Sequence, residues 1–184
     1  MKKTIAVAAF ALLATGCTSW VGPRYNHHVG NTLELRAAGL DKVSIGEIRK
    51  DPEARDDVDQ LRSQTLYIES PYGTYTAYLH EALKIEFDHS DLLDPDSSVR
   101  IDGVLLRNGF GQAADREFVE LEAELTVWRG TEVAYRRTRS ARYDWHANYH
   151  VAMSRAVANY QAGVQRLIAA FIADPEFVAA LRKR

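Results

Sequence analysis

Val119-Glu120-Leu121-Glu122-Ala123-Glu124-Leu125-Thr126-Val127 alternates apolar and polar residues without a break. A period of two residues is typical of a β-strand that buries one face and exposes the other. The turn sequence Arg129-Gly130-Thr131 and a second strand-like run from Glu132 to about Trp145 follow, so the segment predicts an antiparallel hairpin. If Trp128 lies opposite Glu132, Glu124 faces Arg136, and the polar face carries pairs of opposite charge.

Outward from this hairpin, further strands are predicted over 42–48, 61–68 and 99–106. Ser70-Pro71 combines a capping residue with proline at the first helical position, and it predicts a helix that runs to about Asp88. A long helix is predicted over 147–172, and a short one after Asp174-Pro175. The fold class predicted is α+β: a two-layer sandwich in which two long helices cover one face of a mostly antiparallel sheet, with a short C-terminal helix added.

The N-terminus reads as a secretory signal. Lys2 and Lys3 precede an apolar stretch, Thr4 to Leu13, that is shorter than the ~20 residues needed to span a bilayer. Its end, Leu12-Leu13-Ala14-Thr15-Gly16-Cys17, holds the only cysteine of the 184-residue chain. A single thiol forms no internal disulfide, and it excludes zinc sites that need two cysteines.

The sequence around Cys17 resembles the lipobox of bacterial lipoproteins, although Ala14 stands where that motif more often has leucine. The resemblance implies cleavage after Gly16 and acylation of Cys17, and Thr18 in place of aspartate implies sorting to the outer membrane. Three acyl chains would anchor the protein firmly, since about two already suffice. An ordinary signal peptide with a coincidental cysteine is the alternative.

Three regions are therefore expected: a lipoprotein signal peptide over 1–16, a lipidated N-terminus and tether over 17–41, and a single α+β periplasmic domain over 42–184. The stretch from Thr18 to Asn31 would reach ~50 Å when extended, so the domain could stand clear of the membrane. Without residues 1–16 the chain keeps 21 basic and 25 acidic residues, a net charge of −4. This mildly acidic body argues against binding to nucleic acid.

Histidines are the first candidates for chemistry. His146 and His150 have the four-residue spacing that places two metal ligands on one helix face, but no third ligand stands at an obvious position. His80-Glu81 begins a metalloprotease-like motif that has Lys84 in place of its second histidine. His27-His28 falls in the expected tether and is predicted to be solvated.

Four arginines form the one basic cluster, and they are the candidate interaction surface: Arg136, Arg137, Arg139 and Arg142. Guanidinium groups suit phosphate oxygens, so a phosphate or anionic-headgroup site is conceivable. Strict alternation would turn Arg137 and Arg139 toward the apolar side, which calls for a bulge, or for an edge that faces a partner or a polar groove. Glu120, Glu122 and Glu124 are expected to form a salt-bridged solvent face, and Gly109-Phe110-Gly111 is expected to form a turn.

The helix start Ser70 to Lys84, the strand hairpin and the ending Phe171 to Phe177 resemble small proteobacterial lipoproteins, namely the YajG-like lipoproteins and the auxiliary lipoproteins of envelope transport systems. The similarity spans about residues 42–182, and Cys17 is the only functional residue that it carries over. It implies a non-catalytic envelope component that works with a protein partner.

The leading hypothesis is thus a lipid-anchored periplasmic binding or scaffold protein of the outer membrane, with no cofactor and no catalytic residue. One alternative is a periplasmic hydrolase or metal-dependent enzyme with a dispersed site near His146 and His150. The other is a lipid or peptide carrier, which would need a continuous apolar cavity between helices and sheet.

Overall fold

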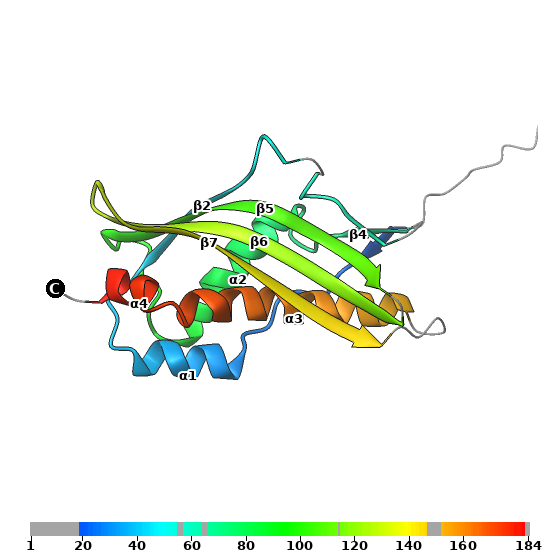
Figure 1. Cartoon of the computed structure of the whole chain (residues 1–184). Coiled ribbons are helices and arrows are strands. Elements are labelled where there is room, and N and C mark those ends of the chain that lie inside the picture. The colour runs from blue at the N-terminus through cyan, green and yellow to red at the C-terminus, as the bar shows by residue number, and fades with distance from the viewer. Residues whose placement is uncertain (1–18, 55–56, 64–65, 114, 147–151, 183–184) are drawn as a thin grey trace, which may run out of the picture.

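The computed structural model describes residues 19–54, 57–63, 66–113, 115–146 and 152–182 (Figure 1). Its main sheet has four strands in the order β2-β5-β6-β7, and its small sheet has three in the order β1-β4-β3. The strands are β1 (Ser19–Val21), β2 (Ser44–Lys50), β3 (Leu61–Ser63), β4 (Leu66–Glu69), β5 (Val99–Ala113), β6 (Arg116–Arg129) and β7 (Glu132–His146). Strands β5, β6 and β7 are antiparallel, whereas β2 lies parallel to β5 and makes the sheet mixed.

Helices α2 (Tyr75–His89) and α3 (Ala152–Ile172) pack on one face of the main sheet, α2 against β2 and α3 against β6 and β7. Helix α4 (Pro175–Leu181) follows α3 and contacts the same two strands. Figure 1 shows these helices as one layer under the sheet, so the predicted α+β two-layer sandwich is confirmed. Helix α1 (Val29–Ala37) lies on the outer side of this layer, against α2 and α3.

The hairpin of β6 and β7 forms where the sequence predicts it, but its register differs. Only Gly130 and Thr131 make the turn, and Gly130 takes a positive φ of 59° that suits such a tight connection. A bulge beside Val127 then shifts the pairing once more, so Glu124 lies opposite Thr138 instead of Arg136. The two shifts add to two residues, and a shift of two leaves every side chain on its predicted face.

The start of α2 corrects the helix predicted from Ser70-Pro71. Gly73 has a φ of 89°, which a helix does not allow, and its amide closes a turn on Ser70 O. Thr74 is the N-cap, and its hydroxyl accepts a hydrogen bond from Ala77 N at 3.1 Å. The single strand predicted over 61–68 is likewise two short strands, β3 and β4.

Residues 19–41 are part of the folded body, so the tether predicted there is wrong from Ser19 onward. Strand β1 pairs with β4, the ring of Tyr25 is 3% exposed, and Leu35 on α1 is 1% exposed. The end of the segment is also fixed, because Asp41 N donates to Leu181 O at 2.8 Å. Buried apolar side chains in a stretch that has little periodicity explain why the sequence pattern missed it.

The core lies between the main sheet and the helices α2, α3 and α4. Gly163 on α3 allows a close approach there, since a Cβ atom at this position would lie 2.5 Å from Val119 Cγ1 on β6. The apolar stripes predicted for both long helices are buried, with Leu83, Phe87, Leu167 and Phe171 each 1% exposed. Within the described part of the chain, no helix is both long and apolar enough to cross a membrane.

Candidate functional site

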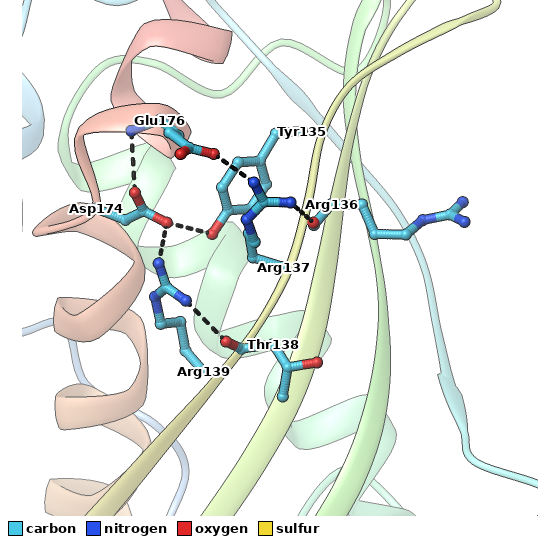
Figure 2. A network of polar contacts seen from close by, with 7 residues as sticks. All are labelled: Tyr135, Arg136, Arg137, Thr138, Arg139, Asp174 and Glu176. Atoms are coloured by element: carbon cyan, nitrogen blue, oxygen red, sulfur yellow. Dashed lines mark hydrogen bonds and ion pairs between the residues drawn. The ribbon is translucent and has the colours of Figure 1, made fainter.

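Two of the four clustered arginines fasten α4 to the sheet. Arg137 and Arg139 lie opposite Leu125 and Ala123, on the face that the helices cover, as strict alternation predicts. Figure 2 shows both guanidinium groups reaching acidic residues at the start of α4. Arg137 donates to Glu176 Oε2 at 2.9 Å, and Arg139 donates to Asp174 Oδ2. The predicted bulge is thus not what places them; they form a polar edge between β7 and α4.

Asp174 is the centre of this network. Its carboxylate caps α4 through Glu176 N at 3.0 Å and accepts a hydrogen bond from the Tyr135 hydroxyl at 2.7 Å. Burial alone would raise the pKa of Asp174, but the Tyr135 and backbone hydrogen bonds together with Arg139 lower it below its usual value. Burial and the same carboxylate raise the pKa of Tyr135. Asp174 is therefore held ionised, as a structural junction.

The other two arginines face solvent on the opposite side of the sheet. Arg136 lies 3.7 Å from Glu124 Oε1 and 3.2 Å from Thr126 Oγ1. Arg142 pairs with Asp144 at 2.9 Å, and its guanidinium carbon lies 3.4 Å from the ring centroid of Phe118. The expected salt-bridged face is present, since Glu120 also pairs with Arg107 at 2.9 Å. These exposed pairs leave Arg136 and Arg142 as the accessible half of the candidate interaction surface.

The candidate histidines do not converge within the described residues. His146 is exposed and lies 3.5 Å from Asp115, while His150 lies outside the described part of the chain. In the described residues, no group of three or more His, Cys, Asp or Glu side chains could hold a metal ion. His27 and His28 are not the solvated pair that was predicted: His27 stacks on His89 with ring centroids 4.0 Å apart, and His28 caps α1.

A pocket lies at the end of the main sheet where β5 finishes. Gly109-Phe110-Gly111 lies within β5, so the turn predicted there is wrong. Phe110 and Trp145 meet edge to face at 6.1 Å, and the Trp145 indole donates to Glu117 Oε2 at 2.7 Å. With Arg62, Gly111, Gln112 and Ala156, these residues line a cavity of about 230 Å³.

This pocket can take a small flat group but little more. Its volume is below the ~300–1,000 Å³ of usual ligand sites. It also lies at one end of the sandwich, whereas side chains fill the space between helices and sheet. The described residues therefore do not form the continuous cavity that the carrier alternative requires.

The sequence analysis missed Glu86, which the fold buries completely. Its Oε1 atom accepts hydrogen bonds from Tyr25 Oη at 2.5 Å and from His28 N at 2.8 Å. Asn31 and Thr32, in the first turn of α1, lie within 3.5 Å of the same carboxylate. A negative group at a helix N-terminus is favoured by the helix dipole and by the free amides there.

A signal for Glu86 was present in the helical spacing. Leu79, Ala82 and Leu83 are buried on α2, and residue 86 continues that row at the next turn. A carboxylate on a buried helix face needs donors from another segment. The sequence does not indicate which segment supplies them, because Tyr25 is 61 residues away.

Cys17, the predicted lipidation site, lies outside the described residues, which begin two positions later at Ser19.

Comparison with known proteins adds the fold. No family model matches the sequence, and no curated protein matches it either. The solved structure of protein XCC0632 from Xanthomonas campestris, of the DUF330 family, has a TM-score of 0.62 and 10% identity over 88% of this chain and 96% of that one. Protein CT253 from Chlamydia trachomatis has a TM-score of 0.50 and 12% identity over 77% and 99%.

A minor lipoprotein from Acinetobacter baumannii follows with a TM-score of 0.45 and 11% identity over 79% and 98%. At such identities a likeness shows the fold and leaves activity open. The chain therefore shares its α+β fold with protein XCC0632 and, more distantly, with CT253.

Proposed function

We propose that this chain is a lipid-anchored binding or scaffold protein of the Gram-negative cell envelope, attached to the outer membrane through Cys17 with its folded domain in the periplasm. The observation that carries the proposal is the order of features at the N-terminus: two lysines, an apolar run, small residues and the single cysteine. The resemblance to YajG-like and transport-auxiliary lipoproteins supports a place in an envelope assembly or transport system.

Acylation of Cys17 is tested by labelling cells with a palmitate analogue and by mass spectrometry of the mature N-terminal peptide. We expect an acylated peptide that begins at Cys17, and a wild-type protein that stays with membranes in high salt. The variant Cys17→Ser should lose both properties, whereas Ser19→Ala, two residues away, should keep them. Membrane retention of Cys17→Ser in high salt would contradict the anchor.

The outer-membrane location rests on Thr18, and it has its own test. Separation of the two membranes on a density gradient should place the wild-type protein in the outer-membrane fraction. Thr18→Asp should shift it to the inner-membrane fraction. A wild-type protein that bands with the inner membrane would leave the anchor standing and refute the sorting.

The partner surface is proposed on the solvent side of β7, around Arg136 and Arg142. β7 is an edge strand of 15 residues, and an edge strand offers unpaired backbone groups to a partner. The charged pairs with Glu124 and Asp144 are exposed, so a partner can exchange with them at little cost. Arg137 and Arg139 instead hold α4.

Site-specific photocrosslinking in intact cells tests this surface. A photoreactive residue in place of Arg136 should capture a defined envelope protein, and the charge reversal Arg142→Glu should reduce that capture. The control is Leu33 on α1, which is 58% exposed on another face of the molecule. Equal capture from positions 136 and 33 would refute a specific surface on β7.

A further inference from the structure

The small sheet exposes apolar side chains close to the predicted lipid anchor. Trp20 is 47% exposed, Val21 is 63% exposed and Tyr67 is 40% exposed. They are three of the six large apolar side chains that the described residues expose, although the small sheet has only three short strands. Val29, Leu33 and Val133 are the others, and they belong to α1 and β7.

The strands arrange these side chains around one edge. β1 is an edge strand, paired in parallel with β4 through Ser19 with Tyr67 and Trp20 with Ile68. Val21 and Tyr67 therefore lie on one face of the small sheet, and Trp20 lies on the other, where Ile68 is buried. Because Trp20 is half exposed, apolar groups stand on both sides of the β1 edge.

The covalent distance to Cys17 is short. Cys17 precedes Ser19 by two residues, which span at most ~7 Å. Acyl chains on Cys17 would thus hold β1 within about the thickness of a headgroup layer from the bilayer. The ~50 Å of tether that the sequence suggested is absent, because Ser19 already belongs to the small sheet.

We infer that the β1 edge of the small sheet rests on the bilayer surface, with Trp20, Val21 and Tyr67 in the headgroup region. The inference depends on the lipid anchor proposed above. Trp and Tyr are the residues that favour the membrane–water interface, since their rings are apolar and their N–H or O–H groups can stay hydrated.

Charge near the patch agrees with this assignment. Arg62 lies over the Tyr67 ring at 5.4 Å, and the exposed Arg24 lies over Tyr72 at 5.3 Å. Guanidinium groups at the surface are attracted by phosphate headgroups. Glu69 is the one acidic residue in the three strands, and its side chain is exposed to water.

The inferred contact also orients the domain. In Figure 1, β1 and β4 lie at one end of the molecule, whereas α4, the C-terminus and the turn between β6 and β7 lie at the other. With β1 on the membrane, the network around Asp174 points into the periplasm. A partner would then meet the domain from the periplasmic side.

The single natural cysteine allows a direct test. When Cys17 carries lipid, a cysteine introduced by Val21→Cys is the only free thiol, and it can take an environment-sensitive fluorophore. The matched control is Val133→Cys on β7, since Val133 is 41% exposed and lies near the distal turn. The lipidated variants are reconstituted into vesicles of phosphatidylethanolamine and phosphatidylglycerol that contain a brominated lipid.

Bromine should quench the label at position 21 at least several-fold more than the label at position 133. Tyr67→Cys provides a second reporter on β4 if Val21→Cys folds poorly by circular dichroism. Vesicle flotation separates the two proposals. If the protein floats but positions 21 and 133 are quenched equally, the docking is refuted and the anchor stands; if it does not float, the anchor fails and the docking fails with it.

Discussion

The hydroxyl of Tyr25 donates a hydrogen bond to Glu86 Oε1 at 2.5 Å inside the protein, and it joins residues that are 61 positions apart. Burial and the neighbouring carboxylate raise the pKa of Tyr25, so the phenol keeps its proton. Through this bond the segment before α1 is locked to α2. A stretch that resembles a linker in sequence is thereby part of the core.

Tyr25→Phe should destabilise the protein, because it removes a buried hydrogen bond to a charged group. The expected loss is ~1.5–3 kcal/mol in the free energy of unfolding, measured by urea denaturation of the non-lipidated Cys17→Ser protein. Tyr67→Phe is the control, since that residue is 40% exposed and its change should be within ~0.5 kcal/mol.

A double-mutant cycle with Glu86→Gln sharpens this prediction. If the two side chains act through their mutual bond, the double variant should lose less than the sum of the single variants. Strict additivity would show that the bond between Tyr25 and Glu86 contributes nothing of its own.

Truncation distinguishes a folded segment from a tether. A non-lipidated chain that begins at Thr32 lacks β1 and Tyr25, and loss of a buried aromatic residue alone costs ~3–5 kcal/mol. We expect the melting temperature to fall by at least ~6–12 °C relative to a chain that begins at Thr18. Equal melting temperatures would mean that residues 18–31 contribute nothing to the fold.

The sequence predicted those parts of the fold that have a local period. The alternation from Val119 to Val127 and the stripe Leu79, Leu83 and Phe87 led to the hairpin and to α2, and both are confirmed. The position of β1 depends on pairing with β4, almost 50 residues away, for which no local pattern exists.

The candidate site shows the same division. Alternation correctly predicted that Arg137 and Arg139 turn toward the helix side. Their partners, Glu176 and Asp174, come from α4 at the far end of the chain, so their pairing depends on tertiary packing. The aromatic pocket also escaped prediction, because Phe110 and Trp145 come from strands that are not neighbours in the sheet.

Asp174 should make stability depend on pH in the acidic range. Its pKa in the folded protein lies below the usual value of 3.8, so the folded state gains stability above that pH and loses it as the pH falls through the folded pKa. Asp174→Asn keeps a capping side chain but removes the charge. Its free energy of unfolding should therefore fall less steeply than that of the wild type between about pH 5 and pH 2.

Glu176→Gln is the control for Asp174, because Glu176 is an exposed partner of Arg137. Its stability should stay within ~1 kcal/mol of the wild type at neutral pH. Asp174→Ala, which also removes the cap, should lose a further ~0.5–2 kcal/mol relative to Asp174→Asn. Parallel pH profiles of the wild type and Asp174→Asn would contradict the role of this carboxylate.

Two glycines of β5 should respond in opposite ways to alanine. A Cβ atom at Gly103 would lie 2.8 Å from Leu125 Cδ2, 2.9 Å from Ile48 Cδ1 and 3.1 Å from Glu124 O, whereas no atom lies within 4 Å of one at Gly109. Leu125 is 1% exposed and Ile48 is 8% exposed, so neither can move aside freely. Gly103→Ala should therefore lose ~1–3 kcal/mol by overpacking, measured by urea denaturation. Gly109→Ala should be neutral or gain up to ~1 kcal/mol, because alanine has less conformational entropy to lose on folding. Equal effects at both positions would mean that the contact of β2 with β6 across Gly103 does not limit the packing of the sheet.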